Sequence, residues 1–381
     1  MTVARASTVE IQPPQEEDWA RALSAITSAQ RIVLACHVNP DGDALGSMLA
    51  AALGLRRYGA QVQATFPSPF QLPKMFMTLP GLDLLEPPGK VDPEPEVLLC
   101  FDAASAERLG DLTDRMARAR EVVVIDHHAS NTGFGTIHLV DPRAAATAVV
   151  VDELLQRLGV PLDTAIAECL YVALSTDTGS FKYQATSPRE HLLAARLLET
   201  GIRQDEICRR LFDSRPYGAL KLLGEMLDRA VLEPDSAQGV GLVWTYATQD
   251  DLSRHQLPPY VLESMIDVLR TTEEADVACV LKEVTPGEWA VSLRSKGAVN
   301  VARTAIQLGG GGHRYAAGFT GRGELAEIVT AIRNGLVPQQ ATREKAGAAA
   351  AASCSTDAAG SAEGAPSTDA AASSAASDME E

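Results

Sequence analysis

The sequence lacks the features that mark several classes of protein. It has no run of about 18 apolar residues, so no membrane-spanning helix is expected. Residues 1–16 contain no apolar segment typical of a secretory signal, which favours a cytoplasmic protein. The cysteines form no CxxC pair and several lie inside apolar runs, so buried, reduced side chains are expected. These are Cys36, Cys100, Cys169, Cys208, Cys279 and Cys354.

Positive charge is also scarce. The 381 residues include 33 Lys and Arg against 50 Asp and Glu, which gives a formal net charge of -17. Six of the acids follow residue 350, where no Lys or Arg occurs, and without them the charge is still about -11. Non-specific binding of long nucleic acids needs a basic surface. The composition therefore disfavours that class, whereas a small anionic substrate held by metal ions and a few cations remains compatible.

What is present indicates a globular α/β protein. The chain is 46% hydrophobic and 22% charged, and it is long enough for two domains. Apolar runs alternate with helical periodicity, which predicts a mostly parallel sheet flanked by helices, followed by a smaller α/β domain. The expected parts are a flexible arm (1–16), a catalytic domain (17–187), a helical connector (188–230), a second domain (231–337) and a disordered acidic Ala/Ser-rich tail (338–381).

The pattern also predicts the individual elements. In the first domain the strands are expected at 31–36, 62–66, 97–101, 121–125 and 137–140. The helices there are expected at 16–29, 106–119, 145–158 and 164–175, with one more that begins at Asp43 and ends before Gly59. In the second domain the strands are expected at 239–246, 275–282 and 289–294, and the helices at 262–269, 299–308 and 324–334. The connector is expected to break near 214–216.

Four apolar segments end in side chains that bind metals. Their carboxyl ends carry His37, Asp41 and Asp43; Asp102; Asp126, His127 and His128; and Asp177. Ligands collect at the carboxyl ends of strands in open α/β sheets. Five carboxylates and three imidazoles in one site would repel one another unless cations lay among them, and two divalent ions resolve that repulsion. Donors of this kind without a thiolate favour Mn²⁺, ahead of Mg²⁺, Co²⁺ or Zn²⁺.

Taken singly, each of these residues also has an ordinary interpretation. An Asp that follows a strand, such as Asp102 or Asp177, is most often a helix cap or turn former. A lone His37 would be read as a hydrogen-bonded structural histidine. Asp41 and Asp43 flank Gly42 on one sharp turn and can face different ions, while Asp102 is the natural bridge. The metal interpretation therefore depends on all eight of these acids and histidines occurring together.

At these residues the chain resembles the DHH/DHHA1 phosphoesterases, the superfamily that includes RecJ-type exonucleases. The resemblance covers about residues 17–337, and the length is similar to the NrnA-type branch of nano-RNases and pAp phosphatases. The motifs that carry it are His37-x-x-Pro40-Asp41-Gly42-Asp43, Asp102, Asp126-His127-His128, Asp177 within Ser175–Gly179, and Gly310-Gly311-Gly312-His313-x-x-Ala316-Ala317-Gly318.

The resemblance implies a role for each motif residue. His37, Asp41 and Asp102 would hold one metal, and Asp43, Asp102, His127 and Asp177 the other. Asp126 would support the site or occasionally bind a metal, and His128 would protonate the leaving group or position the phosphate. The resemblance also implies a homodimer, and an active-site cleft is expected between the two domains.

The second domain is expected to select the substrate. Backbone N–H groups of a loop at Gly310, Gly311 and Gly312 can cradle an anion, with His313 and Arg294 binding the far end of the substrate. Alone, such a glycine run is more often only a flexible loop. The expected activity is hydrolysis of short RNA such as pApA, and of pAp, by water activated between two metals, with cyclic dinucleotides such as c-di-AMP as further substrates. The alternatives are a non-catalytic cyclic-dinucleotide sensor and an inorganic pyrophosphatase-like hydrolase.

Overall fold

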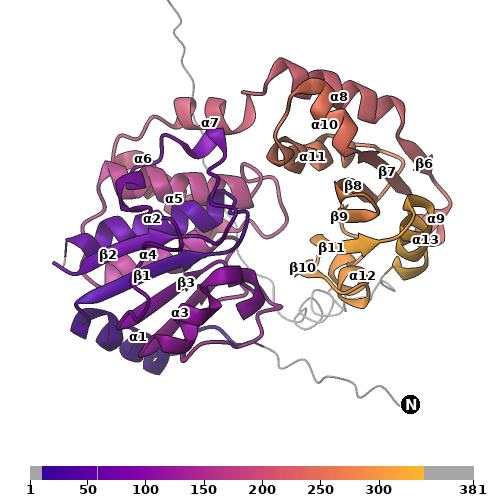
Figure 1. The fold of residues 1–381 in the computed structure, drawn as a ribbon. Coiled ribbons are helices and arrows are strands. Elements are labelled where there is room, and N and C mark those ends of the chain that lie inside the picture. The colour runs from indigo at the N-terminus through magenta and orange to yellow at the C-terminus, as the bar shows by residue number, and fades with distance from the viewer. Residues whose placement is uncertain (1–10, 58, 339–381) are drawn as a thin grey trace, which may run out of the picture. The chain divides into compact units, whose positions relative to one another are not determined.

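The computed structural model describes residues 11–57 and 59–338, and these contain two separate β-sheets (Figure 1). Residues 1–10 of the predicted arm, and the predicted tail beyond Pro338, lie outside the described residues. The predicted domain boundaries remain a proposal. No helix in the described ranges is long and apolar enough to cross a membrane.

The first sheet is entirely parallel, as predicted. Its five strands lie in the order β2-β1-β3-β4-β5, which leaves β5 at one edge. Each strand lies within one residue of its expected bounds. They are β1 Arg31–Cys36, β2 Gln61–Thr65, β3 Val97–Phe101, β4 Glu121–Asp126 and β5 Ile137–Val140.

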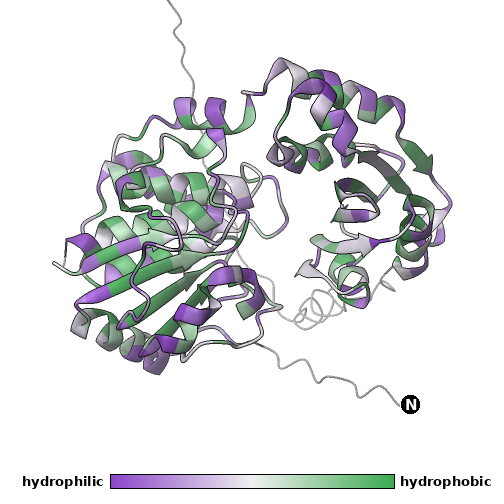
Figure 2. Ribbon diagram, in the orientation of Figure 1, coloured by the Kyte–Doolittle hydropathy of each residue, from purple (hydrophilic) through white to green (hydrophobic). Residues whose placement is uncertain are grey.

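The central strands are apolar on both faces, as Figure 2 shows for β1 and β3, because helical segments cover both sides of the sheet. On one face Ile32 and Leu34 pack in a core with helices α1 Glu16–Ser28, α2 Gly42–Arg56, α4 Thr147–Arg157 and α5 Thr164–Asp177. On the other face Val33 and Ala35 pack against Leu109 and Leu112. The expected helix at 106–119 is divided into η3 Ala106–Leu112 and α3 Thr113–Arg118.

Helices α2 and α5 approach each other unusually closely. A Cβ on Gly42 would lie 2.4 Å from Thr176 Oγ1, and one on Gly46 would lie 2.4 Å from the carbonyl oxygen of Cys169. Only glycine permits this approach. The contacts run in opposite chain directions, so the beginning of α2 meets the end of α5. That arrangement brings Asp43 and Asp177 to the same end of the sheet.

The connector is helical, as predicted, with its break between α7 and α8. The helices are α6 Pro188–Glu199, α7 Gln204–Phe212 and α8 Tyr217–Asp228. The second sheet is mixed, with six strands in the order β10-β11-β9-β8-β7-β6. These are β6 Val231–Glu233, β7 Leu242–Ala247, β8 Val277–Thr285, β9 Glu288–Ser295, β10 Gly311–His313 and β11 Ala316–Arg322.

Helices cover both faces of this second sheet as well. Helices α12 Val301–Gln307 and α13 Leu325–Gly335 pack on one face, and α8, α10 Gln249–His255 and α11 Met265–Leu269 pack on the other. Short helical segments complete the described chain: η1 Lys74–Phe76, η2 Leu82–Leu84, α9 Ser236–Gly239 and η4 Pro259–Ser264. Strands β6, β10 and β11 and helix α10 were not anticipated from the sequence.

The prediction of a glycine-rich loop is wrong for Gly311–His313. These residues form β10, which pairs with β11 in an antiparallel hairpin. Gly310 and Gly312 are needed for close packing, since a Cβ on either would lie within 2.6 Å of a carbonyl oxygen of the neighbouring strand. Glycine has low strand propensity, and a run of it carries no alternating pattern. This stretch becomes a strand only through its hydrogen-bonded pairing with β11.

Candidate metal centre

The carboxyl end of the first sheet gathers the predicted ligands. His37 follows β1, Asp102 follows β3, and Asp126 is the last residue of β4. Among the described residues, four groups have one potential ligand atom per residue, all within 4.8 Å of one another. Three contain Asp102: His37, Asp41 and Asp102; Asp43, Asp102 and His127; and Asp102, Asp126 and His128. The fourth is His127, His128 and His313. Asp177, the last residue of α5, places Oδ2 3.3 Å from His127 Nε2. Asp102 belongs to three of the four groups, which is the arrangement expected of a bridging ligand.

His37 and His127 present the same nitrogen to this cluster. His127 Nδ1 lies 3.2 Å from the carbonyl oxygen of Ala144, and His37 Nδ1 lies 2.8 Å from that of Val38. A carbonyl can only accept, so His127 Nδ1 donates and its Nε2 is the ring nitrogen that faces the carboxylates. His37 Nδ1 also lies 3.0 Å from Arg108 Nη2, which can only donate, so these two contacts do not fix the tautomer of His37. Metal-binding histidines are usually oriented in this way.

The spacing of the facing atoms leaves room for ions. His127 Nε2 lies 3.5 Å from Asp102 Oδ1 and 3.8 Å from Asp43 Oδ2, and His37 Nε2 lies 3.5 Å from Asp102 Oδ2. Metal–ligand bonds of about 2.1 Å separate neighbouring ligand atoms by roughly 3 to 3.5 Å. Within the described ranges, the ion pairs of these carboxylates all involve histidine. The donor set therefore fits divalent cations.

Burial and neighbouring charges shift the pKa values of the side chains in this cluster. Burial raises the pKa of Asp43 well above its usual range, and Asp102 and Asp177 raise it further. Burial raises the pKa of Asp177 to about 6, although His127 opposes that change. Burial would lower the pKa of His127, but the charge of Asp177 and its contact with Asp102 outweigh burial and raise it well above its usual range. Burial and neighbouring acids thus raise the pKa of the two carboxyl groups, and the opposite charges of the acids raise the pKa of His127.

Asp43 is held by donors from two elements. Its carboxylate accepts hydrogen bonds from Ser47 Oγ at 2.9 Å, from Thr147 N at 2.6 Å and from Ala148 N at 3.1 Å. The last two are N–H groups of the first turn of α4, which has no side-chain cap of its own because its N-cap residue is Ala146. Asp43 therefore caps α4 from α2, and the positive end of the helix dipole favours its negative charge.

Asp41 occupies a different environment. It is the N-cap of α2, with Oδ1 accepting from Ala44 N at 3.0 Å, and its side chain is 59% exposed. Asp41 is thus a helix cap, a role that was not predicted for it from the sequence, and its predicted metal role would use the same carboxylate. Asp102 adopts the left-handed backbone conformation with φ of 54°. Asp tolerates this region, and such conformations concentrate at functional sites.

Comparison with known proteins agrees with this geometry. Residues 31–174 match the DHH family, N-terminal domain, and residues 242–336 match the DHHA1 domain. The bifunctional oligoribonuclease and PAP phosphatase NrnA of Thermus thermophilus is 32% identical over 292 residues, which cover 77% of this chain and 84% of that protein. The protein of the same name from Bacillus subtilis is 26% identical over 303 residues, which cover 78% of this chain and 91% of that protein.

A solved structure is similar over both sheets. The exopolyphosphatase-related protein from Bacteroides fragilis superposes with a TM-score of 0.75 at 25% sequence identity, covering 84% of this chain and 96% of that one. The chain belongs to the DHH phosphoesterase family. The family's motif is Asp126-His127-His128, where β4 ends.

In this DHH protein, Asp126 supports its two neighbours. Its Oδ1 accepts from His127 N at 2.8 Å and from His128 Nδ1 at 2.7 Å, and its Oδ2 accepts from Asn131 Nδ2 at 2.6 Å. Asp126 is fully buried. Burial would raise its pKa, but His128 brings it down to about 2. Asp126 thus stays ionised and orients His128.

The predicted substrate residues of the DHHA1 domain lie in one row. His313 pairs with Ala316 on the neighbouring strand, and Ala316 pairs with Arg294 on the next. Directly opposed residues share one face of a sheet, so His313 and Arg294 lie on the same face, roughly 10 Å apart, with the small Ala316 between them. The His313 ring stacks on His128 with centroids 4.3 Å apart. The structure thus brings the motifs of both domains together.

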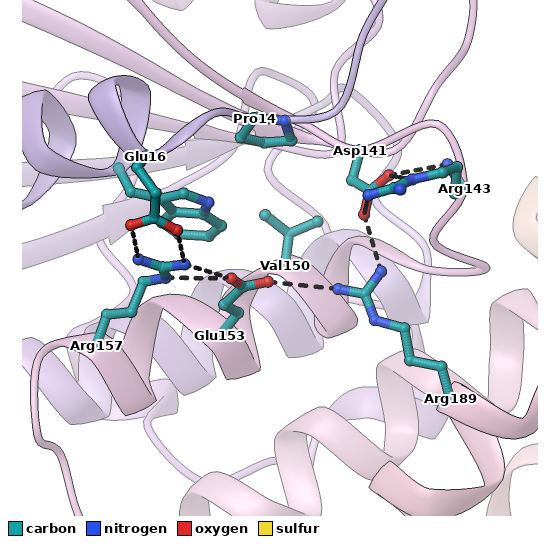
Figure 3. Close-up of a pocket in the computed structure, with 9 residues that line it drawn as sticks. Pro14, Glu16, Asp141, Arg143, Val150, Glu153, Arg157 and Arg189 are labelled. Atoms are coloured by element: carbon teal, nitrogen blue, oxygen red, sulfur yellow. Dashed lines mark hydrogen bonds and ion pairs between the residues drawn. The ribbon is translucent and has the colours of Figure 1, made fainter.

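An ion-pair network holds the loop that leads into α4. It connects α1, α4 and α6 to the loop between β5 and α4 (residues 141–146), as Figure 3 shows. Arg189 Nη1 donates to Asp141 Oδ2 at 2.8 Å, and Arg157 pairs with both Glu16 and Glu153. The same loop carries the Ala144 carbonyl that orients His127. Glu16 begins α1, as the helix predicted at 16–29 requires, and takes part in this network.

Sequence reasoning missed several supporting residues. They are Ser47, Asn131, the Ala144 carbonyl, Thr147 and Arg108, whose Nη2 lies 3.0 Å from His37 Nδ1. A serine four residues after Asp43 on a helix was a detectable signal, because residues at i and i+4 lie on one face. The others contact the motif residues only through tertiary structure.

Proposed function

We propose that this protein is a metal-dependent phosphoesterase that hydrolyses short RNA oligonucleotides and 3′-phosphoadenosine 5′-phosphate (pAp). The observation that carries the proposal is the sharing of Asp102 between the His37 group and the Asp43–His127 group. The Thermus thermophilus relative, named an oligoribonuclease and PAP phosphatase, matches along both domains. The net charge of -17 also favours a short anionic substrate over a long one that needs a basic channel.

Two divalent cations, with Mn²⁺ preferred, are the proposed cofactors. His37, Asp41 and Asp102 would hold one, and Asp43, Asp102, His127 and Asp177 the other. When bound, such a pair acidifies water and offsets the negative charge that develops on phosphate oxygens during hydrolysis. The Nε2 atoms of His37 and His127, which each lie 3.5 Å from an oxygen of Asp102, and the membership of Asp102 in both ligand groups support this assignment.

The proton for the leaving group is assigned to His128. Its Nδ1 donates to Asp126, and contact with this acid raises the pKa of His128 although burial opposes the change. During hydrolysis the oxygen of water bonds to phosphorus, the ester P–O bond breaks, and the leaving oxygen takes a proton from His128 Nε2. The proton that the attacking water loses returns to His128, which restores the starting charge of the site. Proton transfer of this kind typically contributes 10²- to 10⁴-fold to a rate, an order-of-magnitude range.

The far end of the substrate is assigned to the face that carries His313 and Arg294. A guanidinium forms paired hydrogen bonds with phosphate. A spacing of roughly 10 Å across three strands suits a mono- or dinucleotide better than a long strand. Binding energy from this remote end can then assist the reacting phosphate.

A product time course tests the proposal. Wild-type protein with Mn²⁺ is incubated in parallel with pAp, pApA, cyclic di-AMP and inorganic pyrophosphate. We expect mononucleotide from pApA and AMP from pAp, with little phosphate from pyrophosphate. Tight binding of cyclic di-AMP without turnover of any substrate would instead favour the sensor, and rapid hydrolysis of pyrophosphate alone would favour a pyrophosphatase. Either result would overturn the proposal.

A further inference from the structure

Thr147 contacts two carboxylates of the cluster with two different groups. Its backbone N–H donates to Asp43 Oδ2 at 2.6 Å, and its hydroxyl donates to Asp102 Oδ1 at 3.0 Å. Thr147 is completely buried, and Asp43 and Asp102 are almost completely buried. One residue therefore connects the carboxylate from α2 with the one that follows β3.

The position of Thr147 is determined from several directions. The capping of α4 by Asp43 fixes the backbone of its first turn. The preceding loop is held by the buried Glu190, which accepts from Ala145 N at 3.3 Å, and by the pairing of Arg189 with Asp141 (Figure 3). A side chain on such a rigid element can orient its partner.

The two oxygens of Asp102 face different groups. Oδ1 lies 3.5 Å from His127 Nε2, and Oδ2 lies 3.5 Å from His37 Nε2. The terminal torsion of an aspartate has a broad energy profile, so its carboxylate rotates readily unless another group holds it. The Thr147 hydroxyl is a neutral donor to Oδ1 and selects one rotation.

We propose that Thr147 is a positioning residue whose hydroxyl orients Asp102 between the two ligand groups and thereby favours a pair of bound metals over a single one. The role follows from geometry, because no charge is involved and the hydroxyl does not need to touch substrate. It rests on the proposed function only in requiring that the cluster binds divalent cations.

The test compares Thr147→Val with Thr147→Ser. Valine keeps the shape of threonine but has no hydroxyl, whereas serine keeps the hydroxyl. Mn²⁺ binding is measured by calorimetry, and the magnetic coupling of paired ions by electron paramagnetic resonance. We expect two ions with a coupled signal in wild type and Thr147→Ser. In Thr147→Val we expect the second ion to bind about 10- to 100-fold more weakly, the usual effect of losing a group that orients a ligand.

Thr245→Val is the matched control. Thr245 is also buried and donates its hydroxyl to the Met226 carbonyl at 2.6 Å, far from the cluster in sequence and on the second sheet. It should lose a similar amount of thermal stability and retain both ions. If Thr147→Val does not fold, Thr147→Ala and Thr147→Ser give the same comparison.

Two results would overturn the proposal. One is wild-type binding of both ions by Thr147→Val, and the other is equal weakening in Thr147→Val and Thr147→Ser, which would mean that shape and not the hydroxyl matters. Failure of the wild type to bind two ions would instead refute the metal-dependent function itself. The binding readout keeps these two failures distinct, since it needs no substrate.

Discussion

Asp126 Oδ1 accepts a 2.7 Å hydrogen bond from His128 Nδ1, so a fully buried acid orients the imidazole next to the metal ligands. The same oxygen also accepts from His127 N, and the other oxygen accepts from Asn131. All three side-chain hydrogen bonds of Asp126 thus use a carboxylate oxygen as the acceptor. An asparagine side chain at this position would offer only one oxygen, because its other terminal atom is an NH₂ group.

Asp126→Asn is expected to reduce turnover of pApA by about 10²-fold or more, the contribution of a correctly placed proton donor. The amide cannot accept from both His128 and Asn131, and it lacks the negative charge that raises the pKa of His128. Mn²⁺ binding by calorimetry should change much less than turnover. Turnover within about threefold of wild type would contradict this role of His128.

Asp102→Asn is expected to abolish binding of at least one Mn²⁺ ion and nearly all hydrolysis. Asp102 belongs to every candidate ligand group that contains a carboxylate, and an amide is a much poorer bridge than a carboxylate. Metal content after gel filtration and turnover of pAp provide the measurement. Asp92→Asn, which alters a surface ion pair with Arg31, serves as the control and should behave as wild type. Near-normal metal content and turnover in Asp102→Asn would refute the bridging role.

Addition of Mn²⁺ should raise the melting temperature above that measured in EDTA. Burial and then neighbouring acids raise the pKa values of Asp43 and Asp177, and bound cations stabilise the ionised carboxylates in the folded state only. A ligand at about 100 times its Kd adds roughly 2.7 kcal/mol of stability. The stabilisation should be smaller in Asp102→Asn. An equal shift in both proteins would locate metal binding elsewhere.

His313→Ala should weaken hydrolysis of pApA more than that of bis-p-nitrophenyl phosphate, which has no remote end to bind. The side chain lies in one row with Arg294 and stacks on His128. The ratio of kcat/KM for the two substrates is the measurement. Equal losses on both would indicate that His313 acts at the reacting phosphate and not at the substrate end.

Glu233 should make folding depend on acidic pH. Its hydrogen bonds with Arg333, then with Ser236 and Trp244, lower its pKa from 4.5 to about 2. A depressed folded pKa contributes stability that is complete above about pH 4.5 and is lost as pH falls towards 2. Urea unfolding from pH 6 to 3 should therefore show a steeper loss in wild type than in Glu233→Gln or Arg333→Gln. Parallel curves for the three proteins would exclude this linkage.

The elements that carry the site could be predicted because their signals are local. A buried parallel strand is a continuous apolar run, so β1, β3 and β4 and the polar residues after them were visible in the chain itself. The sheet rule that gathers strand ends then placed His37, Asp102 and His127 together. The hairpin β10–β11 was not visible, because glycine has no side chain to show a strand pattern.

By itself, then, the sequence determined which acids and imidazoles are available, on which segment ends they lie, and that they require cations to coexist. Only the tertiary structure decided that Asp43 caps α4 and that Thr147 faces Asp102 from 45 residues away. It also decided that Asp126 orients His128, because the Asp126 carboxylate accepts three hydrogen bonds with its two oxygens. The physical reason is that a hydrogen bond forms between whichever groups packing brings within reach, and the close approach of α2 to α5 and the course of the 141–146 loop determine that packing.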